Sequence, residues 1–84
     1  MSRRPIHQIN LSRGLGGGEV YTLFFTRALL ELGREVSLYV HPEAEFWHRA
    51  DLPGVRLVPV AGGRELLDRL PARDALLVTQ TALF

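Results

Sequence analysis

A group of glycines near the N-terminus is the feature of this 84-residue chain with the clearest chemical meaning. Gly14, Gly16, Gly17 and Gly18 precede Glu19, and they stand between a short apolar segment and a long stretch with helical periodicity. Glycines let the backbone approach a ligand closely, and the amides at the start of a helix favour negative charge. A phosphate or diphosphate is therefore the natural ligand of this loop. Glycine-rich turns also occur simply to join a strand tightly to a helix, and the sequence leaves that alternative open.

The residues within and beside this loop exclude the two common phosphate-binding signatures. In both registers of G-x-G-x-x-G, the last glycine is replaced, by Glu19 in one and by Tyr21 in the other. The P-loop requires a lysine, and all 10 basic residues of the chain are arginine. Arg13 either adds a guanidinium beside the phosphate or is a solvated loop residue. Glu19 either stabilises the helix dipole or orients loop amides or a sugar hydroxyl.

Polar and aromatic residues near the ends of the expected strands are candidates for contacts with a second substrate. Open parallel sheets bind ligands beyond the carboxyl ends of their strands, where His41, Thr79 and Gln80 are expected. The alternatives are a solvated or packing role for His41 and a helix-capping role for Thr79 and Gln80. Phe46 and Trp47 either pack beneath the sheet or form an aromatic platform for a sugar.

Metal and covalent chemistry are not expected. The three histidines are scattered along the chain, whereas a metal site needs three or four convergent ligands. The absence of cysteine excludes thiol catalysis and disulfides, and the absence of lysine excludes Schiff-base chemistry. The sequence has no serine, histidine and aspartate in the order of a catalytic triad, and no pair of carboxylates stands out. No catalytic residue is therefore assigned.

The elements that must position these residues alternate along the chain. Strands are expected at residues 6–11, 36–40, 55–60 and 75–79, and helices at 19–32, 43–51 and 64–70. Gly33 follows the first helix, where a positive φ suits glycine. Strict alternation implies right-handed βαβ units and a parallel sheet. We therefore predict one α/β domain, a Rossmann-like three-layer arrangement with a parallel sheet of about four strands, as an incomplete doubly wound domain.

The first helix has an apolar face that covers about half of its circumference and is the expected contact face. Seven residues form it: Val20, Tyr21, Phe24, Phe25, Ala28, Leu29 and Leu32. Glu19, Thr22 and Thr26 lie on the opposite side. Leu23 and Leu30 fall among these polar residues, either as scattered surface leucines or as a second contact face.

Charge and hydropathy limit the partners and the location that are expected for the protein. The formal net charge of +1 provides no electrostatic footprint for nucleic acid or for an anionic membrane. No stretch approaches the roughly 18 apolar residues of a membrane span, and no apolar run follows Arg3 and Arg4 as in a signal peptide. Together with the absence of cysteine, these features favour a cytoplasmic protein.

Two segments resemble the N-terminal domain of GT-B glycosyltransferases of family 4. That family has a Gly-Gly-x-Glu signature after its first strand, and a Gly-His-x-Val segment that enters its second. The matching positions are Gly16, Gly17, Glu19, Gly33 and Val36. Arg34 stands where the family usually has histidine. The similarity covers about residues 6–40, and beyond them only the order of elements agrees.

The resemblance implies a two-domain enzyme that moves a sugar from a nucleotide-diphosphate sugar to an acceptor. The nucleotide sugar is a substrate, and no cofactor is implied. The donor diphosphate would lie at Arg13, Gly16, Gly17, Gly18 and Glu19, and the acceptor would be held mainly by this domain. The donor nucleotide would be gripped by a C-terminal GT-B domain with a Glu-x7-Glu motif. Residues 1–84 contain no such domain, so we expect a partial N-terminal domain that is inactive alone.

Two other functions remain open. The chain is alternatively a small phosphate- or nucleotide-binding module that acts without a second domain. It is otherwise a structural domain that assembles with itself, without catalysis, through an open sheet edge or through the first helix. The partner is accordingly the C-terminal domain, a phosphorylated ligand or a second copy of the chain.

Overall fold

Seven elements alternate along the chain in a computed structural model that describes residues 4–14, 16–71 and 76–79. In chain order they are β1 (Ile6–Asn10), α1 (Gly17–Glu31), β2 (Val36–Val40), α2 (Phe46–Arg49), β3 (Arg56–Pro59), α3 (Gly63–Arg69) and β4 (Leu76–Thr79). The helix expected at 43–51 is limited to the four residues of α2. Within the described ranges, none of the helices combines the length and apolarity needed to cross a membrane.

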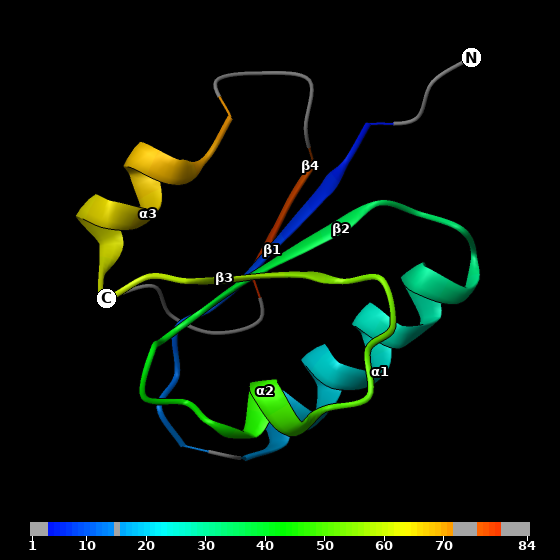
Figure 1. Ribbon diagram of the computed structural model, residues 1–84, viewed down its shortest axis with the longest axis horizontal. Coiled ribbons are helices and arrows are strands. Elements are labelled where there is room, and N and C mark those ends of the chain that lie inside the picture. Colours follow the sequence, from blue (N-terminus) through cyan, green and yellow to red (C-terminus); the bar gives the residue numbers. More distant parts are fainter. Residues whose placement is uncertain (1–3, 15, 72–75, 80–84) are drawn as a thin grey trace.

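The four strands form one parallel sheet in the order β3-β2-β1-β4 (Figure 1). Ile6 of β1 lies opposite Val36 of β2 on one side and opposite Leu76 of β4 on the other. The chain thus moves outward from β1 through β2 to β3, then returns to the far side of β1. The strand order reverses between β1 and β4. The predicted parallel α/β arrangement is confirmed.

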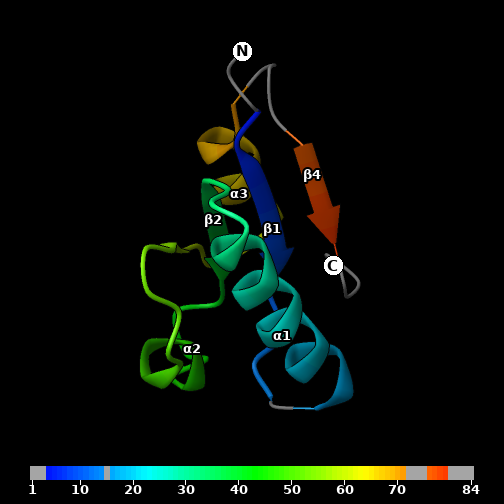
Figure 2. The ribbon, with the colours of Figure 1, turned by 90° about the vertical axis from the view of Figure 1, so that its right-hand side faces the viewer.

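Helices cover both faces of the sheet. Figure 1 shows α1 and α2 on one side of the strands and α3 on the other, and in Figure 2 α1 runs in front of the strands. Alternate residues of each strand point to opposite faces and so form two cores. The core under α3 contains Ile9, Tyr39, Val58, Val60 and Leu66. The core under α1 and α2 contains Leu38, Val40, Ala44, Trp47 and Leu52.

The orientation of α1 differs from the sequence-based prediction. Thr22 and Thr26 are fully buried, whereas Tyr21 and Phe24 are each 60% exposed. Leu23 and Leu30, interpreted from the sequence as surface leucines or a second contact face, pack against the core under α1 and α2. The expectation that the apolar face contacts the sheet was therefore wrong, and the mixed face does so instead.

Polar residues of β1 explain this orientation. Gln8 and Asn10 lie fully buried on the strand face that α1 covers. The Asn10 side-chain amide donates a hydrogen bond to the Thr22 hydroxyl at 3.0 Å, and the Gln8 amide donates to the Thr26 hydroxyl. Because buried amides need hydrogen-bonding partners, the two threonines rather than the aromatic residues face the strand.

The end of α1 agrees with the prediction for Gly33. Its φ is +78°, and its N–H donates to the Leu30 carbonyl at 3.0 Å. The Arg34 N–H donates to the Leu29 carbonyl at 3.0 Å. These two bonds form a Schellman cap, whose left-handed residue favours glycine because a side chain would be strained there. Gly33 thereby turns the chain into β2.

Candidate functional site

The glycine loop, of which the structure describes Gly14 and residues 16–18, lies at the position in the sheet where parallel α/β proteins bind ligands. It leaves the carboxyl end of β1, and β1 is the strand at which the order reverses toward β4. Connections from the two sides of such a reversal run to opposite faces of the sheet and leave a crevice between them. The predicted phosphate loop therefore opens α1 beside this reversal point.

The start of α1 offers backbone donors. Gly16 is the N-cap residue with extended backbone angles (φ −149°, ψ −163°). The first helical hydrogen bond runs from the Val20 N–H to the Gly16 carbonyl at 3.1 Å. The N–H groups of Gly17, Gly18 and Glu19 precede it and have no carbonyl four residues earlier within the helix. These amides lie at the positive end of the helix dipole.

Asn10 and Thr22 hold the glycine loop in place, and the sequence analysis did not assign them this role. The Asn10 side-chain carbonyl accepts a hydrogen bond from the Ser12 N–H at 3.2 Å. The Ser12 hydroxyl in turn donates to the Gly14 carbonyl at 3.1 Å. Thr22 donates to the Gly18 carbonyl at 2.9 Å, so both sides of the loop are tied to side chains. The sequence signal for Asn10 was an amide side chain near the end of the strand expected at residues 6–11.

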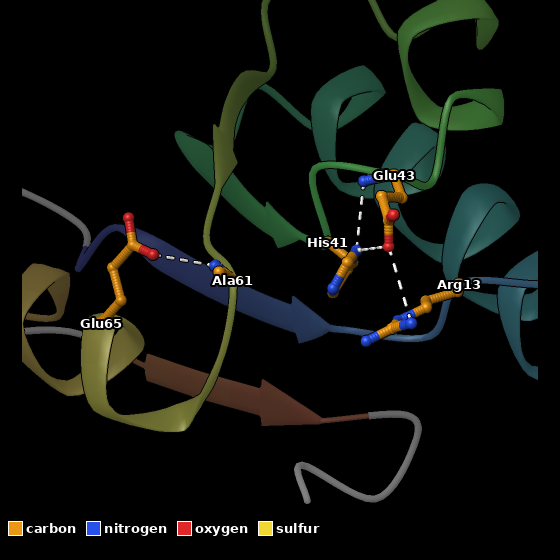
Figure 3. A network of polar contacts seen from close by, with 5 residues as sticks. All are labelled: Arg13, His41, Glu43, Ala61 and Glu65. Atoms are coloured by element: carbon orange, nitrogen blue, oxygen red, sulfur yellow. Dashed lines mark hydrogen bonds and ion pairs between the residues drawn. The ribbon is translucent and has the colours of Figure 1, made fainter.

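Arg13 and His41 converge on the carboxylate of Glu43 (Figure 3). The Arg13 guanidinium lies 3.6 Å from Glu43 Oε2, and His41 Nδ1 lies 3.8 Å from the same oxygen. The structure thus brings together one residue of the predicted phosphate site and one of the predicted acceptor site. Arg13 and Glu43 have side-chain exposures of 71% and 68%, so their ion pair is solvated and weak.

His41 is buried, and its ring is oriented by the backbone. The Glu43 N–H donates a hydrogen bond to His41 Nδ1 at 3.1 Å. A ring nitrogen that accepts this bond carries no proton, so the neutral ring is protonated on Nε2. The 3.8 Å approach of Nδ1 to the Glu43 carboxylate is therefore not an ion pair in this state. Burial of the ring agrees with the predicted packing role of His41. The predicted ligand contact of His41 stays a prediction.

Glu19 lies apart from the Arg13 group. It is only 6% exposed, and one carboxylate oxygen approaches to 3.4 Å of the place where a Cβ on Gly16 would stand. Among the described residues, its carboxylate takes part in no hydrogen bond or ion pair. The side chain lines a groove between α1 and α2 together with Leu23 and Trp47. Glu19 therefore faces this groove and does not join Arg13.

A second Gly-Gly-x-Glu sequence, which was not among the sequence-based predictions, opens α3. Gly62 is the N-cap of α3 and Glu65 stands in the first turn. Glu65 accepts a hydrogen bond from the Ala61 N–H at 2.8 Å (Figure 3). We call residues 16–19 the first glycine turn and residues 62–65 the second glycine turn. Searching the sequence for repeats of the motif would have found the second one.

The other predicted site residues are only partly described. Thr79 ends β4 and lies opposite Ile9 of β1, which places its backbone beside the reversal point. Gln80 and the side chain of Thr79 lie outside what the structure describes. In the described parts of the chain, no three histidine, aspartate or glutamate side chains converge as metal ligands would.

The pKa values of His7 and Tyr39, two groups on the face of the sheet that α3 covers, are shifted. His7 Nδ1 lies 2.8 Å from the Tyr39 hydroxyl on the face that α3 covers. Burial lowers the pKa of His7, and the positive charge of Arg56 lowers it further. Burial raises the pKa of Tyr39. Burial is the larger cause of both shifts.

Comparison with known proteins found no match to this chain. No protein-family profile matches the sequence, and no curated protein or solved structure matches it either.

Proposed function

We propose that the chain is the N-terminal, acceptor-side domain of a GT-B glycosyltransferase that moves a sugar from a nucleotide-diphosphate sugar to an acceptor. The domain would be an incomplete doubly wound unit, and transfer would require a second domain. The observation that carries this proposal is the first glycine turn, which begins α1 beside the reversal of strand order. Diphosphates bind such positions in α/β proteins because backbone amides and the helix dipole both favour negative charge.

Arg13 is the side chain that would complete this diphosphate site. Its solvated pair with Glu43 has a separation of 3.6 Å, and exposed pairs of this kind contribute only about 0–1 kcal/mol. Replacing the Glu43 carboxylate by a phosphate oxygen as the partner of Arg13 therefore costs little free energy. Charge-assisted hydrogen bonds to phosphate are stronger than neutral hydrogen bonds. Glu43 would hold Arg13 at the loop until a ligand arrives.

The acceptor would lie at the same edge of the sheet. His41 stands at the end of β2 and Thr79 at the end of β4, on either side of β1. Together with Gln80 these are the proposed acceptor contacts. The Nε2–H of His41 would donate to an acceptor oxygen, since Nδ1 is occupied by the Glu43 amide.

Titration with uridine diphosphate tests the binding part of the proposal. We expect weak, saturable binding by calorimetry and a dissociation constant about tenfold higher for Arg13→Ala, the usual effect of removing a bond to a charged group. Gly16→Ala should also weaken binding, because a methyl group at the N-cap would narrow the approach to the amides of α1 and would lie 3.4 Å from a Glu19 carboxylate oxygen. Gly62→Ala is the matched control, since a Cβ there meets nothing within 4 Å. Two results would overturn the diphosphate site: no binding by the unaltered chain, or equal losses of affinity in Gly16→Ala and Gly62→Ala.

The reading frame beyond codon 84 tests the enzyme part. A further α/β domain with a Glu-x7-Glu pair is the expected finding. A stop codon directly after Phe84 would reject the glycosyltransferase and leave the simpler phosphate-binding module. The binding proposal and the enzyme proposal can fail separately, because diphosphate affinity is measured on residues 1–84 alone.

Self-assembly without catalysis is the second candidate, and the outer face of α1 favours it. Tyr21, Phe24 and Leu32 are each at least 60% exposed, and the Tyr21 and Phe25 rings stack with centroids 5.9 Å apart. Contiguous exposed apolar side chains of this size are typical of contact surfaces. Sedimentation should then show a concentration-dependent dimer that Phe24→Gln abolishes. A monomer at all concentrations would reject this candidate.

A further inference from the structure

The groove between α1 and α2 is lined by a buried indole that has no hydrogen-bond partner among the described residues and by a buried carboxylate. Trp47 is only 3% exposed, and its indole Nε1 is buried without a hydrogen-bond partner. Glu19 is 6% exposed, and none of the hydrogen bonds or ion pairs of the described residues involves its carboxylate. The described residues that line the groove are Glu19, Leu23, Phe46, Trp47, Arg49 and Ala50. A buried indole N–H is normally paired, so Trp47 calls for a partner, and the Glu19 carboxylate lies beside it in the groove wall.

The size of the groove restricts that partner to a small molecule. Its volume is about 220 Å³, below the roughly 300–1,000 Å³ of sites for drug-sized ligands. Its walls are mainly apolar, from Leu23, Phe46 and Ala50. The Phe46 and Trp47 rings lie 4.8 Å apart between centroids and are tilted by 44°. A single ring with one apolar face fits these walls.

The polar groups decide the charge of the ligand. An ionised carboxylate only accepts hydrogen bonds, and an indole N–H only donates them. An anion would be repelled by Glu19. The Arg49 guanidinium is exposed and paired with Glu45 at 3.6 Å, so a small cation is the competing ligand that the tetramethylammonium titration tests. A hydroxyl both donates and accepts, so neighbouring hydroxyls on one neutral ring satisfy Glu19 and Trp47 together.

We infer that this groove binds a neutral, hydroxyl-bearing ring, a monosaccharide or cyclitol, through Glu19 and Trp47. The carboxylate of Glu19 accepts a hydrogen bond from one hydroxyl, and the Trp47 indole donates to another. The C–H face of the ring packs on Phe46, as sugars do on aromatic side chains. Sugar binding here requires neither a diphosphate at the glycine loop nor a second domain.

The second glycine turn supports a ligand role for Glu19. Glu65 occupies the same place in its turn, and its carboxylate reaches back to the Ala61 N–H at 2.8 Å. This arrangement is a variant of the capping box. In the capping box the acidic residue accepts from the N-cap N–H, whereas here the donor is the residue before the N-cap Gly62. Glu19 makes no such bond among the described residues, so its carboxylate retains its capacity to accept from a ligand.

Trp47 is the single tryptophan of the chain, so its indole signal reports on this groove alone. The experiment titrates the chain with methyl glucoside and with myo-inositol, following the indole N–H resonance by NMR and the fluorescence in parallel. We expect a saturable shift with at least one probe. Acetate and tetramethylammonium, an anion and a cation of small size, should produce none.

Glu19→Gln should raise the dissociation constant for the bound probe about tenfold, as expected for loss of a bond to a charged group. Glu65→Gln is the matched control, the same change at the second glycine turn, and should leave it unaltered. Phe46→Leu provides a second variant at the groove wall and should also weaken binding. Circular dichroism checks that each variant is folded.

Three results would overturn the inference: no saturable indole shift with either probe, equal weakening by Glu19→Gln and Glu65→Gln, or tighter binding of acetate or tetramethylammonium. Uridine diphosphate affinity and its loss in Arg13→Ala are measured separately, so failure of the groove is distinguishable from failure of the diphosphate site.

Discussion

The two glycine turns have the same Gly-Gly-x-Glu sequence and the same local structure, yet they stand in different places in the sheet. Each begins a helix from an extended N-cap glycine, Gly16 for α1 and Gly62 for α3. The first follows β1, at which the strand order reverses, and the second follows β3, the outermost strand of the sheet on its side. Glu65 is hydrogen-bonded within its turn, whereas Glu19 faces a groove. The motif accompanies a helix start in both places, and only the first of the two lies beside the reversal of strand order.

The helices that follow these turns also dock differently. α3 inserts Leu66 into an apolar core, whereas α1 places Thr22 and Thr26 against the polar residues of β1. A helix held by hydrogen bonds is fixed in rotation more strictly than one held by a single leucine, because hydrogen bonds are directional. This contrast leads to predictions that separate the two helices, from the largest expected effect to the smallest.

Leu66→Ala should lower the free energy of unfolding by about 2–5 kcal/mol, the range for truncating a buried leucine. Leu66 is 2% exposed in the core under α3. Leu67→Ala is the matched control on the same helix, because Leu67 is 70% exposed and should change stability by less than about 0.5 kcal/mol. Urea denaturation measures both. Similar losses would mean that α3 does not dock through Leu66.

Thr26→Val should lower the free energy of unfolding by about 1–3 kcal/mol, since it leaves the buried Gln8 amide without its partner. The side chains have nearly the same shape, so packing is preserved. Phe24→Gln on the opposite face of α1 is the control and should stay within about 0.5 kcal/mol. If Phe24→Gln were the more damaging change in the monomer, α1 would contact the sheet through its apolar face as the sequence suggested.

Glu65→Ala should lower the free energy of unfolding by about 0.5–1.5 kcal/mol, the net contribution of one hydrogen bond. Glu19→Gln should not lower it, because the described structure gives its carboxylate no bond to lose. Chemical denaturation of the two variants measures whether the glycine turns differ as described. A loss of stability in Glu19→Gln equal to that of Glu65→Ala would show that both carboxylates serve as caps.

The smallest effect concerns pH and the buried pair under α3. Burial and then the charge of Arg56 hold the pKa of His7 below its ordinary value of 6.5. The unfolded chain therefore takes up this proton first as the pH falls below about 6.5, and stability decreases from there down to the lower pKa of the folded state. His7→Gln should reduce this slope in denaturation series between pH 7 and 5. An unchanged slope would assign the pH dependence to other groups.

The sequence predicted the elements better than their orientation. Alternating strands and helices, and glycine at the C′ position of Gly33, follow from local patterns, because period and backbone freedom are properties of short segments. The buried face of α1 was predicted wrongly because it depends on Gln8 and Asn10, which lie on another element. Tertiary hydrogen bonds outweighed the apolar periodicity of the helix.

The candidate site was predicted in the same uneven way. The glycine loop and Arg13 were candidates from the sequence because their types and spacing are local, and their binding role stays a prediction. The pairing of Arg13 and His41 through Glu43 needed the strand order, which brings the ends of β1 and β2 side by side. The role of Asn10 and the groove beside Glu19 likewise depend on how α1 and α2 pack.

Amide chemical shifts of the two glycine turns during a uridine diphosphate titration test the central claim most directly. One spectrum reports on Gly16, Gly17 and Gly18 together with Gly62 and Gly63. The account predicts saturable shifts at the first glycine turn and none at the second, because only the first lies beside the reversal of strand order. Shifts of equal size at both turns, or at neither, would contradict it.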